Sequence, residues 1–179
     1  MSKKPKRGGL SLRDAAVLAV KKKQTVFVPK RMEKIFMHWM KNLRDWNISR
    51  QIVWGIRIPV WYKDDEVRVS EKSPGKEWVQ ETDVFDTWFS SGQWPFITLG
   101  FPKGKDSKTF YPTSVMETGW DILFFWVARM MMLGLYATNK VPFKYVYLHG
   151  LVRDKDRQKM SKSKGNVIDP LGVVEQFGA

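Results

Sequence analysis

The chain has 179 residues, of which 43% are hydrophobic and 14% aromatic, so it is too apolar for an intrinsically disordered polymer and long enough for one packed domain. Its net charge of +13 suits a polyanionic partner such as a nucleic acid or a nucleotide, although a solvated basic surface explains the same excess. The chain has no cysteine, which excludes disulfides and thiolate metal sites. It also has no continuous run of about 18 apolar residues and no cleavable signal pattern, so we expect a cytoplasmic protein that binds no membrane.

The amino-terminal part of the chain is strongly basic. Residues 1–31 carry ten Lys or Arg against one acidic residue, and we expect them to form a basic arm before the main domain at 32–179. Within this arm the pattern predicts a short amphipathic helix from Ser11 and a strand over 26–28. Apolar residues then return to helical spacing, which predicts a second helix over 32–48.

The middle of the chain is rich in aromatic residues and turns. Segment 52–62 is aromatic and β-branched, and the simplest interpretation is a buried strand interrupted by a turn. Residues 63–83 are polar and charged and predict a surface insertion or loop. We expect 83–101 to be a loop held by large aromatic anchors, and 102–109 to be a second charged loop.

The carboxyl-terminal part predicts an α-β-α unit. Segment 118–138 is the strongest predicted helix, because Thr118 and Asp121 have the spacing of a capping box before a run that is hydrophobic nearly all round. A strand over 145–148 and a helix from Pro170 follow. This order is typical of a parallel α/β sheet.

Three lysines and two serines lie close together in 159–166, whose sequence is Lys-Met-Ser-Lys-Ser-Lys-Gly-Asn. The loop follows the carboxyl end of a predicted strand, where open α/β sheets bind nucleotides. Lysines there can neutralise charge that develops on a triphosphate during an in-line displacement. By composition alone, a solvated basic loop explains the same residues.

Residues 159–163 match letter for letter the Lys-Met-Ser-Lys-Ser signature of class I aminoacyl-tRNA synthetases. The stretch 149–170 resembles the valine, isoleucine and leucine subgroup, and 83–91 and 117–129 resemble the valyl enzymes in particular. The resemblance covers roughly residues 12–179. It implies the second half of a Rossmann-like, parallel-sheet catalytic domain with loop insertions.

The resemblance also implies a role for individual residues. Lys159 and Lys162 match the lysines that stabilise the transition state of adenylation, and are therefore the implied catalytic residues. The positions that match ATP-binding residues are Gly119, Asp121, His149, Gly150, Met160, Ser161 and Ser163. Two structural alternatives stay open, since His149 can be an ordinary strand terminus and Asp121 a helix cap.

Three apolar residues match the side chains that border valine in the resembled enzymes. They are Trp88, Ile122 and Trp126, of which the last two share one face of the predicted helix. Packing in the core is the alternative explanation for each of them.

The implied reaction uses ATP with Mg²⁺ as a substrate to activate valine, which is then transferred to tRNA(Val). The other family signature, His-Ile-Gly-His, is missing, since the only histidines are His38 and His149. We therefore expect a fragment, inactive alone, that needs a complementary amino-terminal half. The resemblance also implies that residues 1–31 are the junction from an editing insertion that is missing here. The segment 63–82 also lacks the Cys-x-x-Cys pairs of many relatives, so we expect no zinc and no other resident metal.

Two other interpretations fit the same residues, a non-catalytic module and a degenerate fragment. A non-catalytic RNA-binding module would use the basic residues of 1–31 and of the loop 153–164. A degenerate fragment would fold poorly, because half of a parallel sheet leaves an unpaired edge and an exposed apolar face.

Overall fold

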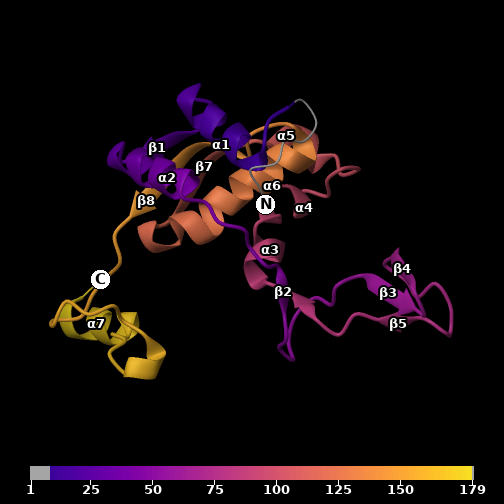
Figure 1. Cartoon of the computed structure of the whole chain (residues 1–179). Helices are drawn as coiled ribbons and strands as arrows, with labels where there is room; N and C mark the ends of the chain where they lie inside the picture. The colour runs from indigo at the N-terminus through magenta and orange to yellow at the C-terminus, as the bar shows by residue number, and fades with distance from the viewer. Residues whose placement is uncertain (1–8, 179) are drawn as a thin grey trace.

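A parallel three-stranded sheet forms the centre of the molecule (Figure 1). The computed structural model describes residues 9–178; residues 1–8, the start of the expected basic arm, and residue 179 lie outside the described part. The strand order is β1 (Val26–Val28), β8 (Phe143–His149) and β7 (Thr113–Gly119), and both pairings are parallel. The parallel α/β fold expected from the sequence is confirmed.

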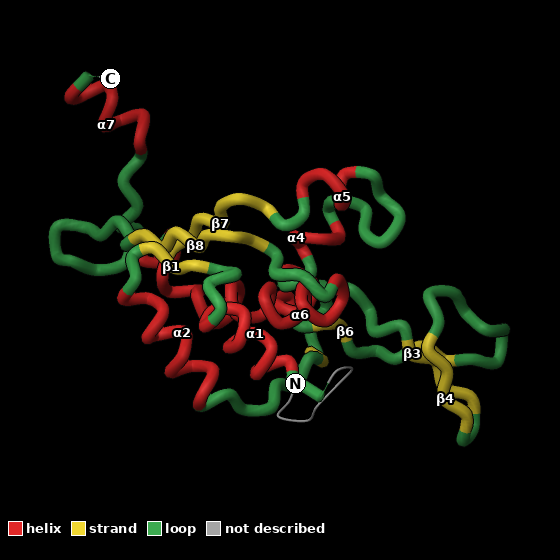
Figure 2. The backbone as a smooth tube through the Cα atoms, turned by 90° about the horizontal axis from the view of Figure 1, so that it is seen from above, coloured by secondary structure: helices red, strands yellow, loops and turns green. Residues whose placement is uncertain are grey.

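Three helices cover one face of this sheet, as Figure 2 shows. They are α1 (Leu12–Lys21), α2 (Arg31–Lys41) and α6 (Arg129–Thr138). The largest fully buried side chains between the helices and the sheet include Phe27, Phe36, Met40, Met130, Met131, Phe143 and Val146. Helix α1 begins as expected after Ser11, whose hydroxyl accepts the backbone N–H of Asp14 at 3.1 Å. The described part of the expected basic arm therefore supplies a helix and a strand to the core, and its origin as a junction stays a prediction.

The expected helix over 118–138 begins at Trp120 and takes three helical forms in succession. It starts with a 3₁₀ turn, η1 (Trp120–Ile122), continues as a π-helical stretch, η2 (Leu123–Ala128), and becomes α6. The expected burial is confirmed by Leu123, Val127 and Ala128, which are at most 1% exposed. By length and composition Trp120–Thr138 could cross a membrane, but half of its apolar window is buried inside the fold, and a core helix passes the same test.

The capping box expected at the start of this helix is wrong. Thr118 lies in β7 and pairs with Leu148 of β8, so its backbone belongs to the sheet. The residue before the first helical turn is Gly119, in extended backbone and without a side-chain cap. Asp121 is consequently free of a capping role.

The expected helix over 32–48 is also too long. Helix α2 ends at Lys41, where the Asn42 side-chain amide donates to the carbonyl of His38 at 2.9 Å. An asparagine that bonds to the backbone in this way competes with the helical hydrogen bonds, and the helix stops. Trp46 therefore leaves the helix and donates its indole N–H to Asp86 at 2.9 Å.

The interpretation of 52–62 as a buried strand is wrong. Val53 and Trp54 are 91% and 87% exposed. This segment leads from β2 (Ser49–Arg50), which pairs with β6 (Val84–Phe85), into a separate antiparallel sheet. Aromatic and β-branched composition does not reveal that the segment leaves the core, because propensity carries no information on tertiary neighbours.

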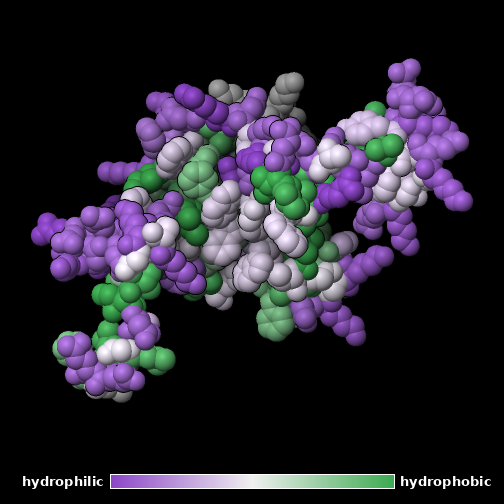
Figure 3. Space-filling view, turned by 90° about the horizontal axis from the view of Figure 1, so that it is seen from below, coloured by the Kyte–Doolittle hydropathy of each residue, from purple (hydrophilic) through white to green (hydrophobic). Residues whose placement is uncertain are grey.

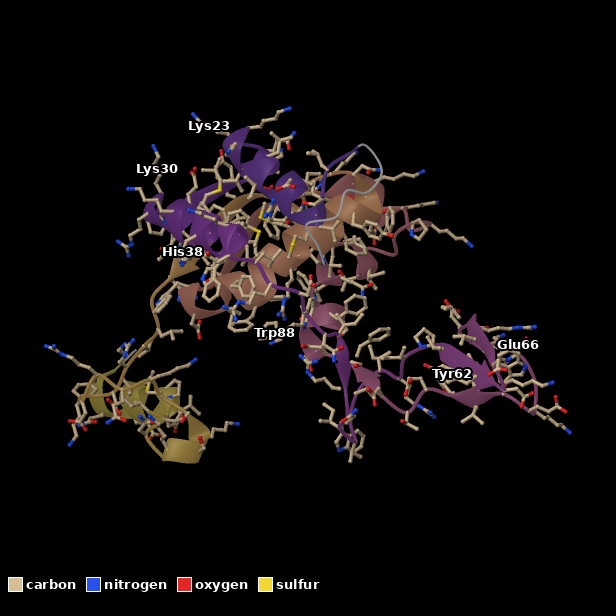
Figure 4. The ribbon with its side chains drawn as sticks, in the orientation of Figure 1. Lys23, Lys30, His38, Tyr62, Glu66 and Trp88 are labelled. Carbon is tan, nitrogen blue, oxygen red and sulfur yellow. The ribbon has the colours of Figure 1, made fainter. Side chains whose placement is uncertain are left out.

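The charged insertion is a small sheet that stands apart from the core. Its strands are β3 (Val60–Lys63), β4 (Glu66–Val69) and β5 (Val79–Gln80), with β3 in the middle. Figure 4 shows Tyr62 and Glu66 on this sheet, far from the helices. The surface insertion expected at 63–83 is confirmed.

The remaining loops contain short helices. These are α3 (Thr87–Ser91), α4 (Trp94–Ile97), α5 (Asp106–Phe110), the 3₁₀ turn η3 (Lys162–Lys164) and α7 (Pro170–Phe177). Aromatic anchors do hold 83–101, since Phe96 packs with Tyr111 and Leu133 in a second small core. Asp169 caps α7 as expected, by accepting the N–H of Leu171.

The second face of the parallel sheet is open among the described residues. Val115, Tyr145 and Tyr147 are 56%, 49% and 47% exposed. Parallel sheets are normally covered on both faces. Hydrophobic side chains are also visible on the α7 arm in Figure 3, where Phe177 is 76% exposed.

A buried threonine connects the beginnings of β1 and β8. The hydroxyl of Thr25, which is fully buried, donates to the carbonyl of Phe143 at 2.8 Å. We expect Thr25→Val to lower the free energy of unfolding by about 1–2 kcal/mol, because it leaves this buried carbonyl short of a donor. Urea unfolding measures the change, and Thr109→Val on an exposed site of α5 is the control. Equal stability of the two variants would contradict this role of Thr25.

Candidate functional site

The carboxyl ends of β7 and β8 meet at one edge of the sheet and bring together several residues predicted from the sequence. Gly119 and His149 are partners in the register, so both strands end at the same level. A Cβ on Gly119 would lie 2.7 Å from Oδ1 of Asp121 and 3.1 Å from Leu151. A side chain here would displace the Asp121 carboxylate, so the glycine lets this carboxylate lie against the strand end.

The lysine loop reaches the same place. Lys159 Nζ lies 2.8 Å from Oδ2 of Asp121, 38 positions earlier in the chain. The side chains of Lys159 and Asp121 are 61% and 26% exposed. An ion pair of this kind is worth about 0–1 kcal/mol, so an anionic ligand with several charges can displace it.

His149 is held between two oxygen atoms. Its Nδ1 lies 2.6 Å from the carbonyl oxygen of Gly150, and its Nε2 lies 2.7 Å from Oε1 of Glu117. In this structure His149 is therefore a strand-end histidine whose two ring nitrogens both have partners. Because its side chain is also exposed, it can still contact a ligand. Sequence reasoning did not single out Glu117, two residues before Gly119 in β7.

The loop that carries the lysines is tied into a defined shape by Asn166. The side chain of Asn166 accepts the N–H of Ser161 at 2.9 Å and donates to Oδ2 of Asp154 at 2.6 Å. This bond, together with the N–H of Gln158, lowers the pKa of the Asp154 carboxyl below its usual value. Gly165 closes the 3₁₀ turn with a φ of 66°, a left-handed conformation that favours glycine.

Within this loop the predicted residues differ in their surroundings. Met160 and Ser161 are partly buried, whereas Lys162 and Ser163 are exposed. The hydroxyls of Ser161 and Ser163 lie 3.3 Å apart. The structure therefore joins Lys159 to the strand ends and presents Lys162 to solvent.

We expect Asn166→Ala to loosen the loop. The change removes the bonds to Ser161 and Asp154, so amide hydrogen exchange over 154–166 is expected to rise at least tenfold, which hydrogen-exchange mass spectrometry measures. Asn139→Ala, at the end of α6, is the control. The pKa of Asp154 is lower in the folded protein than in the unfolded chain. Its contribution to the stability of the folded loop is therefore present above the unfolded pKa and is lost as pH falls through the folded pKa. Unchanged exchange in Asn166→Ala would contradict the role of this contact.

The three residues of the predicted valine pocket lie on elements that pack together, α3 and the helix from Trp120. The Trp88 ring is 5.8 Å from that of Phe125, and the indole N–H of Trp126 donates to the carbonyl of Ser91 at 3.0 Å. Ile122 is partly buried in η1. Within residues 9–178, no ring contact or hydrogen bond joins one of the three to another, so the pocket stays a prediction.

A buried charge cluster lies beside Trp88 and was not singled out from the sequence. Asp86 caps α3 by accepting the N–H of Trp88 at 2.7 Å, and also accepts the indole of Trp46 and the guanidinium of Arg50. Burial alone would raise the pKa of Asp86, but these donors and the nearby charge of Arg129 lower it below its ordinary value. The signal was available, since Arg129 is the only charged residue between Asp121 and Lys140.

No group of three or more potential metal ligands occurs within residues 9–178. The expectation that the protein holds no zinc stays a prediction.

Comparison with known proteins shows the family of this chain. The sequence pattern of the family described as tRNA synthetases class I (I, L, M and V) matches residues 6–82 and 67–179 of this chain. The chain belongs to this family. The expected membership of an enzyme family is thus confirmed.

The curated relatives are valine–tRNA ligases. The chain is 55% identical over 179 residues to the valine–tRNA ligase of Clostridium acetobutylicum, covering 94% of this chain and 20% of the relative. It is 51% identical over 175 residues to that of Bacillus subtilis, again covering 94% and 20%. The chain thus spans about a fifth of the length of the curated relatives it matches. The resemblance to valyl-type sequences is confirmed.

Solved structures confirm the fold. Methionyl-tRNA synthetase of Mycobacterium tuberculosis bound by methionyl-adenylate has a TM-score of 0.66 at 21% identity, covering 94% of this chain and 30% of that one. The ternary complex of Agrobacterium radiobacter K84 agnB2 LeuRS with tRNA and LeuAMS has a TM-score of 0.60 at 22% identity, covering 82% and 25%. The Rossmann-like class I architecture is therefore established, whereas the roles of the individual site residues stay predictions.

Proposed function

We propose that this chain is part of a valine–tRNA ligase and supplies the lysine-loop side of its ATP site. The observation that carries the proposal is the position of Lys159 over Asp121 at the carboxyl ends of two parallel strands. Open α/β sheets bind nucleotides at this edge. The identity of 55% to a valine–tRNA ligase supports valine as the amino acid and tRNA(Val) as the acceptor.

The proposed reaction has two steps. A valine carboxylate oxygen attacks the α-phosphorus of Mg-ATP, the bond to the bridging oxygen breaks, and pyrophosphate leaves with the electron pair. A ribose hydroxyl of the terminal adenosine of tRNA then attacks the carbonyl carbon of valyl-adenylate, and AMP leaves. Neither step needs a protein nucleophile, so positioning and charge stabilisation are what the protein contributes.

In this proposal Lys159 and Lys162 stabilise the negative charge that moves onto the leaving pyrophosphate. Lys159 exchanges its contact with Asp121 for phosphate oxygens, which frees Asp121 to accept a hydrogen bond from the ribose. Gly119, His149 and Gly150 form the strand edge beside the nucleoside, and the loop residues Met160, Ser161 and Ser163 line the phosphates.

The valine side chain would lie against Trp88, Ile122 and Trp126. The open face of the sheet, with Tyr145 and Tyr147, supports a complementary part of the enzyme as a partner. We further propose that the protein works in the cytoplasm. Activity is best measured in a chimera, defined as the Bacillus subtilis relative in which this chain replaces the residues that it matches.

Protection of lysines by ATP tests the proposal. The chain is treated with an amine-acylating reagent with and without Mg-ATP, and the modification of each lysine is measured by mass spectrometry. We expect protection of Lys159 and Lys162, and no protection of Lys23 and Lys30, which Figure 4 shows pointing outward from the helical side.

Two results would contradict the proposal. Equal labelling with and without ATP, in both the chain and the chimera, would exclude the lysine loop as an ATP site. Protection by generic RNA that weakens steeply with salt, without any response to ATP, would instead support the non-catalytic RNA-binding module.

A further inference from the structure

A cavity of about 550 Å³ lies beside the end of α2. The segment that follows α2 forms one wall, with Arg44, Trp46 and Arg50, and the helix from Trp120 forms the other, with Phe124 and Arg129. None of its lining residues belongs to the predicted ATP site or to the predicted valine pocket. Its volume is in the range of small-molecule sites.

Arg129 is the unusual residue of this cavity. Its relative exposure is 7%, and its Nη1 is buried without a hydrogen-bond partner. The guanidinium carbon lies over the Trp46 ring, 3.6 Å from its centroid, and 5.7 Å from the centroid of the Phe124 ring. Aromatic faces attract a guanidinium but do not replace the hydrogen bonds that it loses on burial.

The protein does not compensate this charge with an ion pair among the described residues. The nearest acid is Asp86, whose oxygens already accept from Arg50, Trp46 and the backbone of Trp88. Asp86 forms its ion pair with Arg50, so it offsets the charge of Arg129 only from a distance, and Arg129 has no ion pair of its own within residues 9–178. Buried charges in proteins are normally paired, so an unpaired guanidinium in a cavity wall indicates a missing acceptor.

The other residues of the cavity indicate what that acceptor is. Arg44 adds a second positive charge, and Asn47 adds an amide. Asp45 is the only carboxylate in the lining, and it has an interaction of its own. Planar guanidinium groups bind the two oxygens of a carboxylate or phosphate with matched geometry.

We propose that this cavity is a binding site for a small molecule that carries an oxyanion, with Arg129 as the buried donor and Arg44 at the mouth. The cavity is larger than an inorganic anion needs, and Trp39, Leu43, Phe124 and Met132 supply apolar surface. The ligand therefore has an apolar or aromatic body attached to its phosphate or carboxylate. The site does not depend on the proposed synthetase activity.

Calorimetric titration of this chain with three probes tests the proposal. Inorganic phosphate measures the anion contact alone, adenosine monophosphate joins phosphate to an aromatic body, and benzoate joins carboxylate to one. We expect at least one of the two aromatic probes to bind more tightly than phosphate. Which of them does so distinguishes a phosphate ligand from a carboxylate ligand.

Variants locate the binding. Arg129→Met keeps an unbranched side chain against the Trp46 ring and is expected to weaken binding at least tenfold with little change in the melting temperature of the free protein, because the buried Nη1 that it removes has no hydrogen-bond partner. Arg44→Ala is expected to weaken binding several-fold, and Arg68→Ala on the distant β4 strand to leave it unchanged. If Arg129→Met does not fold, the comparison of probe binding by Arg44→Ala and by Arg68→Ala still tests the proposal.

Four results would overturn the proposal. The first is no binding of any probe at millimolar concentration, and the second is binding that Arg129→Met and Arg44→Ala leave intact. The third is binding that is lost in the chimera, which would assign the cavity to a side chain of the longer protein. Binding that disappears instead in the Lys159→Ala, Lys162→Ala double variant would place the probe at the lysine loop. That last result would contradict this site while supporting the proposed function.

Discussion

Asp86→Ala is expected to lower the free energy of unfolding by about 2–4 kcal/mol. The carboxylate has a relative exposure of 7% and joins the start of α3 to Trp46 and Arg50. Its removal leaves the partly buried guanidinium of Arg50 without its acid and removes the nearest negative charge from Arg129. The loss is smaller than for a fully buried pair because the Arg50 side chain is 40% exposed. Denaturant unfolding, followed by the tryptophan fluorescence, measures it.

The control for this prediction is Asp65→Ala, at an exposed turn between β3 and β4. It is expected to change stability by less than about 0.5 kcal/mol. The pH dependence gives a second test. The folded pKa of Asp86 is lowered, so its stabilisation is present above the unfolded pKa of about 3.9 and is lost as pH falls through the folded pKa. Asp86→Asn is therefore expected to flatten the acid limb of the stability profile, and a profile identical to that of the parent chain would contradict this assignment.

Lys162→Ala in the chimera is expected to lower the rate constant of valine-dependent ATP–pyrophosphate exchange by about 10²–10³-fold. Lys162 is exposed and makes none of the contacts that hold the loop, so its removal does not disturb the contact of Asn166 with Ser161. The effect should fall on the maximal rate more than on the KM for valine, since the charge is needed where it develops during the displacement.

Lys164→Ala is the matched control for this variant. It lies in the same 3₁₀ turn and removes the same charge, but its ammonium contacts only the side chain of Gln158, at 3.3 Å. We expect a change of less than about threefold, in line with the modest value of exposed charges. Equal losses in Lys162→Ala and Lys164→Ala would show that the loop contributes only general positive charge.

The architecture near the sheet was predictable because local signals and burial agree there. The alternation in β8 and the caps of α1 and α7 are signals that short segments carry by themselves. The errors lie where a distant neighbour decides. Trp46 has helical spacing, but it lies beyond the end of α2 and its indole N–H donates to Asp86, 40 positions later. Trp54 has the composition of a core strand and is exposed.

The candidate site was predictable only in part for the same reason. The signature in 159–163 identified the lysines, but nothing in the sequence showed that Lys159 lies beside Asp121. The roles of Glu117 and Arg129 depend on register and on depth of burial, which a pattern of residue types does not contain. A lone arginine in an apolar helix was the one usable sign.

The most direct test of the central claim is ATP–pyrophosphate exchange driven by single amino acids. The measurement compares valine with isoleucine, leucine and methionine, on the chain alone, on the chain mixed with the amino-terminal part of the Bacillus subtilis relative, and on the chimera. The account predicts exchange with valine in the mixture or the chimera, lost in Lys162→Ala, and none with the chain alone. A folded complex and a folded chimera that show no valine-dependent exchange would contradict the assignment of this chain to valine activation.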